Sequence, residues 1–213
     1  MHAPIRTVIF DFEGTLVDFQ WRLAEAEAEL RAAFAQQGYA VEGNYARMWN
    51  LAADRAMAPD RIDALRRALY PVYDRWDGDA LTRWSARAGA AALLQRLAER
   101  GVAAALVSNI GRTALDAALV RFGLRDRLRR VVSRDDVTRL KPHPQGVAIA
   151  LAATNTPPDQ ALFVGDSLAD VHAARAAGLR VAIIRGGEAP ETDFVAAPPD
   201  WLITRLDEVA GLI

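Results

Sequence analysis

Short apolar runs that alternate with helical patterns constrain the fold of this chain more than any other feature of its sequence. Runs rich in β-branched residues predict five strands, at Thr7–Phe10, Val102–Val107, Val131–Ser133, Ala161–Val164 and Val181–Ile184. Between the later runs, the spacing of apolar residues predicts helices at Ala114–Phe122, Gly146–Ala153 and Leu168–Ala177. This alternation is typical of βαβ units, in which helices cover both faces of a parallel sheet. We therefore predict an α/β fold with a doubly wound parallel-sheet (Rossmann-like) core.

The segment from residue 18 to residue 84 interrupts this alternation. Its pattern is almost purely helical, and Pro59 and Pro71 predict that it is divided into several helices. The chain is thus expected to form two units. Residues 1–17 and 85–213 would form the Rossmann-like core, and residues 18–84 would form a small helical cap inserted after the first strand. At the other end, the segment 200–213 predicts a short strand and a closing helix.

The composition narrows the class of protein. Of the 213 residues, 52% are hydrophobic, which suffices for one sizeable core with a small attached subdomain. The formal net charge of −1 provides no basic field for nucleic acid or for an acidic membrane surface. Cysteine is absent, which excludes disulfides, thiolate catalysis and Cys-ligated zinc. No apolar run is long enough for a signal peptide or a membrane span. We expect a cytoplasmic protein without a nucleic-acid or membrane partner, and the oligomeric state stays open.

The chain contains a single lysine, Lys141, and every other basic side chain apart from histidine is arginine. An ammonium is a compact charge, whereas a guanidinium is planar and needs more room. We interpret Lys141 as a residue that a site requires. The alternative is a tolerated position on the surface.

Polar side chains follow the predicted strands. In a doubly wound sheet, ligands bind beyond the carboxyl ends of the strands. The residues found there are Asp11, Glu13, Gly14 and Thr15 after the first strand, Ser108 and Asn109 after the second, and Asp166 and Asp170 after the fourth, with Lys141 ahead of a later helix. Each one alone is explained by helix capping. Together at one rim of the sheet they favour a functional site.

This set of residues fits one kind of chemistry well. Crowded carboxylates repel one another unless a cation lies between them, and hard oxygen ligands suit Mg²⁺. A carboxylate that attacks phosphorus needs such a cation, further donors for the phosphoryl oxygens, and a second acid for proton transfer. Each of these roles has a candidate in the set.

The motifs "DFEGT", "SN", "K" and "GDSLAD", in this order, resemble those of the haloacid dehalogenase-like (HAD) hydrolase superfamily, in its phosphatase branch. The resemblance extends over essentially the full chain, and the helical insert resembles the cap of that family. It implies a Mg²⁺-dependent phosphatase that hydrolyses a small phosphorylated metabolite through an aspartyl-phosphate intermediate.

The resemblance also implies a role for each motif residue. Asp11 would be the nucleophile and a metal ligand. Glu13 would be the general acid/base and would offer its backbone carbonyl to the metal. Asp166 would bind the metal directly, and Asp170 would orient Lys141 or metal-bound water. The implied substrate-binding residues are Gly14, Thr15, Ser108, Asn109 and Lys141.

Glu13 departs from the usual pattern, because most phosphatases of the family carry aspartate there. Three alternative functions therefore stay open. A haloacid dehalogenase would use the same nucleophile on carbon, although Glu13, Asp166 and Asp170 argue against it. A sugar phosphomutase would share the phosphatase residues. A non-catalytic member would have lost the function of its acid/base.

Overall fold

The computed structural model describes residues 3–213, and in these residues it contains one six-stranded sheet. The strands are β1 (Thr7–Phe10), β2 (Ala103–Val107), β3 (Arg130–Val132), β4 (Ala161–Gly165), β5 (Arg180–Ile184) and β6 (Trp201–Ile203). They lie in the order β3-β2-β1-β4-β5-β6, and every neighbouring pair is parallel. This is the order of a doubly wound fold. The predicted α/β class is confirmed.

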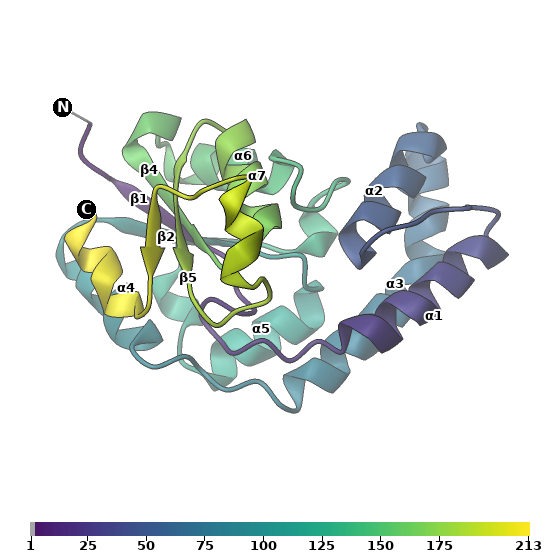
Figure 1. Ribbon diagram of the computed structural model, residues 1–213, viewed down its shortest axis with the longest axis horizontal. Coiled ribbons are helices and arrows are strands. Elements are labelled where there is room, and N and C mark those ends of the chain that lie inside the picture. Colours follow the sequence, from purple (N-terminus) through teal and green to yellow (C-terminus); the bar gives the residue numbers. More distant parts are fainter. Residues whose placement is uncertain (1–2) are drawn as a thin grey trace.

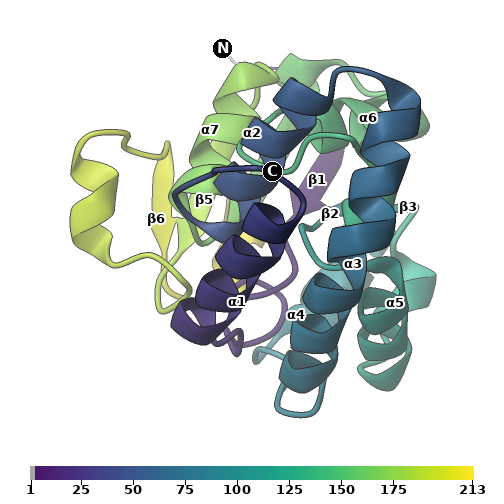
Figure 2. The ribbon, with the colours of Figure 1, turned by 90° about the vertical axis from the view of Figure 1, so that its right-hand side faces the viewer.

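Helices cover both faces of the sheet. Figures 1 and 2 show α4 (Ala90–Glu99) and α5 (Arg112–Arg121) on one face, and α6 (Gln145–Thr154) and α7 (Leu168–Ala176) on the other. Helices α5, α6 and α7 occupy the predicted positions with small shifts at their ends. Helix α4 was not predicted from the sequence. The spacing of its buried leucines is typical of a helix and could have indicated it.

The segment between β1 and α4 forms three further helices. They are α1 (Leu23–Gln36), α2 (Tyr45–Ala56) and α3 (Pro59–Leu81). In Figures 1 and 2 these helices lie together beyond one end of the sheet. Here they are called the helical insert.

The segment is divided into several helices as predicted, but Pro71 is not one of the points of division. Helix α3 begins at Pro59, a favourable first position for proline, and continues through Pro71 to Leu81. A proline inside a helix removes one backbone hydrogen bond and adds a steric clash. Packing offsets this cost, because Leu69 on one side of Pro71 and Tyr73 on the other are both fully buried.

The predicted closing helix is present as a 3₁₀-helix over Leu206–Gly211. At its start, the Glu208 carboxylate accepts hydrogen bonds from the backbone N–H groups of Thr204 and Arg205.

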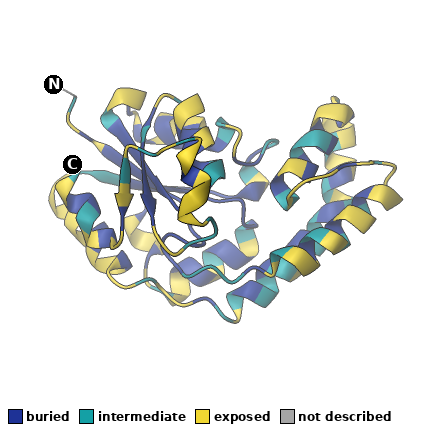
Figure 3. Cartoon of the chain, in the orientation of Figure 1, coloured by how far each residue is buried: buried dark blue, intermediate teal, exposed yellow. Residues whose placement is uncertain are grey.

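The central strand positions the site. Strand β1 is buried along its whole length, and Figure 3 shows the inner strands in dark blue, whereas the edge strand β6 is partly exposed. Phe10 lies opposite Leu106 of β2 and Val164 of β4, so these three strands end side by side. The residues that follow them are therefore neighbours in space. Within residues 3–213, no helix combines the length and the apolar character that a bilayer span requires.

The helical insert joins the core through two adjacent segments. Val17 forms an antiparallel bridge with Ala86, and the backbone N–H groups of Asp18 and Arg87 donate to the carbonyls of Ser85 and Leu16. The chain thus leaves the core and returns to it at one place.

Candidate active site

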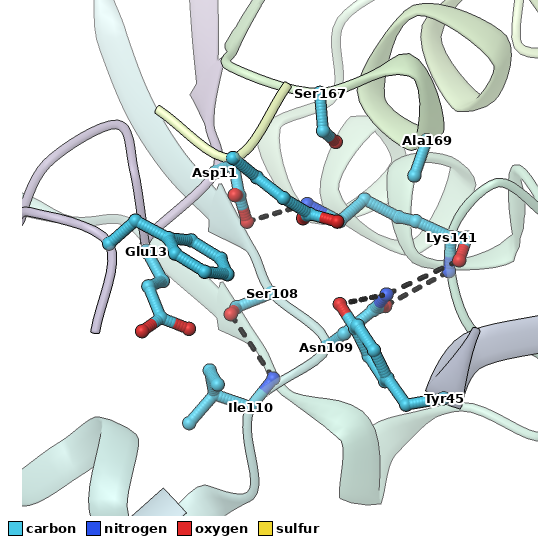
Figure 4. A pocket seen from close by; sticks show the side chains of 11 residues that line it. Asp11, Glu13, Tyr45, Ser108, Asn109, Ile110, Lys141, Ser167 and Ala169 are labelled. Carbon is cyan, nitrogen blue, oxygen red and sulfur yellow. Dashed lines mark hydrogen bonds and ion pairs between the residues drawn. The ribbon is translucent and has the colours of Figure 1, made fainter. Parts of the chain in front are cut away.

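A small cavity lies beyond the carboxyl ends of the central strands, between the sheet and the helical insert. Its volume is about 20 Å³, which is little more than the space for one water molecule. Figure 4 shows the side chains around it. They are Asp11, Glu13, Phe19, Tyr45, Ser108, Asn109, Ile110, Lys141, Ser167, Ala169 and Glu188.

Lys141 lies between two buried carboxylates. Its Nζ atom is 2.5 Å from Asp11 Oδ1 and 2.7 Å from Asp170 Oδ1, and the lysine side chain is only 4% exposed. Asp11 follows β1 directly, whereas Lys141 comes from the loop ahead of α6. These two residues are 130 positions apart in the chain. The isolated lysine of the sequence is therefore a buried cation at the end of the central strand.

Asp170 holds Lys141 in place from the first turn of α7. Its Oδ2 atom accepts hydrogen bonds from the backbone N–H groups of Asp166 and Ser167 and from the Ser167 hydroxyl. This is a capping box, in which the side chains at the first residues of a helix satisfy its free N–H groups. Both oxygens of Asp170 are thus occupied, so this residue orients Lys141 and is poorly placed to bind a metal.

Asp166 lies beside Asp11 and is held by two other segments of the core, the loops after β1 and β5. The Thr15 hydroxyl donates to its Oδ1 atom at 2.9 Å, and the backbone N–H of Glu188 donates to its Oδ2 atom at 2.6 Å. Gly14 passes so close that a Cβ atom there would lie 2.0 Å from Asp166 Oδ2. Gly14 also has a φ angle of +81°, a conformation that favours glycine. In this structure Gly14 and Thr15 therefore position Asp166.

The carboxylates of this cluster are crowded and buried. Burial raises the pKa of Asp11 to about 6, with Lys141 opposing the shift and Asp170 adding to it. Burial, with the neighbouring charges of Asp11 and Asp170, also raises the pKa of Asp166 well above its usual range. Oxygens of all three acids lie within 4.8 Å of one another. One ammonium thus faces three carboxylates, and a divalent cation bound by Asp11 and Asp166 would relieve the excess negative charge. The donor set consists of oxygens, which fits Mg²⁺.

Glu13 is held differently. Its Oε1 atom accepts three hydrogen bonds, each of 2.8 Å, from the backbone N–H groups of Gln20 and Trp21 and from the indole of Trp84. Burial raises the pKa of this carboxyl to about 7. In Figure 4 the carboxyl points away from the ion pair of Asp11 and Lys141. Gln20 and Trp84 lie next to the two segments that join the insert to the core. Glu13 therefore connects the site to both of these segments.

Ser108 and Asn109 follow β2 and line the cavity. The Asn109 side chain accepts from the backbone N–H of Lys141 at 3.0 Å and donates to the carbonyl of the same residue at 3.2 Å. The loop after β2 is thus fixed to the loop that carries Lys141. The Ser108 hydroxyl accepts a hydrogen bond from the backbone N–H of Ile110.

The helical insert contacts both of these loops. Asn50 of α2 exchanges two hydrogen bonds with the backbone of Leu140, the residue before Lys141. Asp77 of α3, which is 1% exposed, accepts hydrogen bonds from the Trp21 indole and from the backbone N–H of Gly111, close to Asn109 in the chain. Its charge is balanced by Arg134, a fully buried arginine 2.8 Å away.

Sequence reasoning missed several residues that line the cavity, and two of them, Glu188 and Tyr45, carry polar groups that could contact a ligand. Glu188 comes four residues after the end of β5 and lies at the same rim of the sheet as the other polar residues. Its position after a predicted strand is the sequence signal that could have identified it. Tyr45 is the first residue of α2, and its hydroxyl accepts a hydrogen bond of 3.4 Å from Asn109. No pattern in the sequence brings a helix of the insert to this point.

Comparisons with known proteins agree with this geometry. A family model described as haloacid dehalogenase-like hydrolase matches residues 8–184. An N-acetylmuramic acid 6-phosphate phosphatase of Pseudomonas putida is 30% identical, over 86% of this chain and 84% of its own. A phosphoglycolate phosphatase of Rhodospirillum rubrum is 31% identical, over 92% of this chain and 90% of its own.

A solved structure shares the fold. The crystal structure of a HAD family hydrolase from Deinococcus radiodurans, with bound phosphate and sodium, matches with a TM-score of 0.67. The two sequences are 23% identical, and the match covers 99% of this chain and 96% of that one.

Proposed function

Because this chain belongs to the haloacid dehalogenase-like hydrolase family, we propose that it is a Mg²⁺-dependent phosphatase of small phosphate monoesters with Asp11 as its nucleophile. One observation carries the proposal. The buried ammonium of Lys141 lies 2.5 Å from Asp11, and Asp166 lies beside the same carboxylate, at the rim where a doubly wound sheet binds ligands. The relatives named above are phosphatases, which supports the same reaction.

The reaction begins at Asp11. Its pKa of about 6 leaves the carboxylate ionised at neutral pH. The oxygen that does not contact Lys141 attacks phosphorus, a bond forms between Asp11 and the phosphoryl group, and the bond to the leaving-group oxygen breaks. Lys141 balances negative charge on both the nucleophile and the phosphoryl oxygens. The Ser108 hydroxyl and the backbone N–H of Asn109, whose side-chain amide is engaged with Lys141 and Tyr45, offer further hydrogen-bond donors from the loop after β2.

Glu13 completes the cycle as the acid/base. A pKa of about 7 suits a group that must release and take up a proton near neutral pH. In the first step the Glu13 carboxyl, which points away from Asp11 in this structure, turns toward it and gives its proton to the leaving oxygen. In the second it takes a proton from water, which attacks phosphorus and releases phosphate from Asp11. Mg²⁺, held by Asp11, Asp166 and the backbone carbonyl of Glu13, would supply the charge neutralisation that lets a phosphate dianion approach a carboxylate.

We propose that residues 18–84 act as a cap over this site. A cavity of about 20 Å³ does not accommodate a phosphate ester. Phe19 and Tyr45 line it from the side of the insert, so their displacement would admit substrate. The paired segments around residues 16–18 and 85–87 provide a place for such movement.

The test is the release of phosphate from a panel of phosphate monoesters, with and without Mg²⁺. We expect turnover of at least one ester that a chelator abolishes. Metal-independent turnover of 2-chloropropionate without phosphatase activity would instead favour the dehalogenase function.

A further inference from the structure

We propose that Asn50, on α2 of the helical insert, is a positioning residue for Lys141. Through this asparagine the insert holds the lysine against the proposed nucleophile, Asp11. The inference rests on the phosphatase function proposed above and gives a residue outside the cavity a task in that reaction. Asn50 is not among the described residues that line the cavity, so it acts through the chain and not by touching the substrate.

Two asparagines bind the backbone of successive residues in the loop that carries the lysine. The Asn50 Oδ1 atom accepts from the N–H of Leu140 at 2.8 Å, and its Nδ2 atom donates to the carbonyl of Leu140 at 2.9 Å. Asn109 makes the same pair of contacts with the backbone of Lys141, at 3.0 and 3.2 Å (Figure 4). Asn109 belongs to the core, whereas Asn50 belongs to the insert. Each unit thus holds one residue of this loop.

The core offers no substitute for Asn50. Within residues 3–213, the backbone N–H of Leu140 donates to Asn50 and to no group of the core. Leu140 is buried, and a backbone donor that loses its partner in a buried place is costly, so the loop would shift to satisfy it. Such a shift reaches Lys141 directly, because it is the next residue.

The lysine depends on its backbone for precision. Its ammonium is paired with Asp11 and Asp170, but these ion pairs fix only the tip of the side chain. The tip and the backbone are joined by a flexible stem of four carbons. Contacts that fix the backbone, those of Asn50 among them, therefore reduce the range of positions that the ammonium can take beside the nucleophile.

Other residues of the insert hold the preceding part of the same loop. The indole of Trp49, on α2, donates to the carbonyl of Thr138 at 3.1 Å, and Arg66, on α3, donates to the carbonyl of Val137 at 2.9 Å. The loop before the lysine is thus attached to the insert at several points. A displacement of the insert would therefore also release the loop.

The single lysine permits a test that needs no turnover. Lysine labelled with carbon-13 at Cε gives NMR signals from Lys141 alone, because the chain has no other lysine. In a fixed side chain the two Hε protons lie in different surroundings and give separate signals, whereas rapid exchange among rotamers merges them. We expect separate signals in the wild-type protein and merged signals in Asn50→Ala. The signals should be absent in Lys141→Arg, which confirms their assignment.

The matched control is Asn44→Ala. Asn44 is an exposed asparagine that caps the same helix, α2, by accepting from the backbone N–H of Arg47. Its loss weakens the start of the helix without touching the lysine loop, so the Hε signals and kcat should stay as in the wild-type protein. Equal effects of Asn44→Ala and Asn50→Ala would overturn the proposal, because they would reflect a general loosening of the insert.

A second variant covers the case in which Asn50→Ala does not fold. Asn50→Asp keeps the oxygen that accepts from Leu140 and loses only the donor to the carbonyl. It should change the Hε signals and kcat in the same direction as Asn50→Ala, to a smaller extent. Circular dichroism identifies which of the two variants is folded, and wild-type signals in the folded variant would overturn the proposal.

Kinetics with p-nitrophenyl phosphate and saturating Mg²⁺ measures the consequence for the reaction. In Asn50→Ala we expect kcat to fall by about tenfold or more with KM within about threefold of the wild-type value, because a small displacement of a catalytic group slows the chemical step. A raised KM with unchanged kcat would overturn the proposal, because Asn50 would then act on substrate binding.

Failure of the proposed function gives a different result from failure of this inference. If no phosphate ester is hydrolysed by the wild-type protein while the Hε signals merge in Asn50→Ala, the phosphatase function is wrong and the hold of the insert on Lys141 stands. If the wild-type protein releases phosphate and Asn50→Ala retains both its kcat and its separate signals, only the role of Asn50 is overturned.

Discussion

Lys141 Nζ lies 2.5 Å from Asp11 Oδ1, so the only lysine of the chain is paired with the proposed nucleophile. The same Nζ reaches Asp170, and the side chain is almost completely enclosed. A planar guanidinium needs more room than this enclosure gives. The relationship explains why a chain that otherwise uses arginine keeps one lysine.

We predict that Lys141→Arg is nearly as inactive as Lys141→Ala, with both losing about a hundredfold or more in kcat. Charge alone would not restore the geometry. Phosphate release under saturating substrate measures the effect, and Arg175→Lys, at an exposed ion pair on α7, is the reciprocal control. An Arg variant with most of the wild-type activity would contradict this account.

Mg²⁺ should raise the melting temperature of the wild-type protein, and Asp166→Ala should remove that shift. A ligand that binds only the native state stabilises it by RT ln(1 + [L]/Kd). Thermal unfolding of each protein, with added Mg²⁺ and with chelator, measures the shift in melting temperature and needs no enzymatic activity. Asp193→Ala, which changes an acid in the same C-terminal region outside the cavity, should keep the wild-type shift. An unchanged shift in Asp166→Ala would place the metal elsewhere.

Two substitutions separate the two properties of Glu13. Glu13→Gln can still accept the hydrogen bonds from Gln20, Trp21 and Trp84, but it cannot transfer a proton. Glu13→Asp keeps the acid but is shorter by one methylene, about 1.5 Å, so it cannot reach all three donors. A displacement of about 1 Å can cost on the order of a hundredfold in rate.

We therefore expect both Glu13 variants to lose kcat, but to differ in which step of the reaction is slowed. Glu13→Gln should accumulate phosphoenzyme when the leaving group needs no proton, as in p-nitrophenyl phosphate. Glu13→Asp should be slow in both steps and accumulate none. Rapid quenching followed by measurement of protein-bound phosphate distinguishes them. A clear rise of kcat in Glu13→Asp across many esters would instead favour the non-catalytic function.

The buried pair of Arg134 and Asp77 should matter for stability. We predict that Arg134→Met lowers the free energy of unfolding by about 3 kcal/mol, because Asp77 is left as a buried charge. Arg75 lies on α3, as Asp77 does, and forms an exposed pair with Glu29 of α1, so Arg75→Met should cost less than about 1 kcal/mol. Chemical denaturation measures both. Equal effects would show that the insert does not depend on this pair.

The residues of the core that surround the site were predictable because they follow strands. Asp11, Ser108 and Asp166 each come after an apolar run, and parallel strands that end together bring such residues to one rim. The helical character of the insert was equally predictable from its periodicity. The continuity of α3 was not, because the packing that carries it through Pro71 is tertiary.

The contacts between the insert and the core could not be predicted. Trp21 and Trp84 are large aromatic residues, whose usual role is packing in a core. The structure instead places their N–H groups on Asp77 and Glu13. Such pairs join positions more than 50 residues apart, and they depend on how α1–α3 fold back over the strands. Local sequence patterns hold no information on that arrangement.

The most direct test of the central claim is phosphate release by Asp11→Asn beside the wild-type protein. A neutral amide is a far poorer nucleophile than a carboxylate, and the substitution hardly changes the size of the side chain. We predict that the variant forms no phosphoenzyme and releases no phosphate, while its circular dichroism spectrum and cooperative thermal unfolding match those of a folded protein. Undiminished phosphate release by a folded Asp11→Asn variant would contradict the aspartyl-phosphate mechanism.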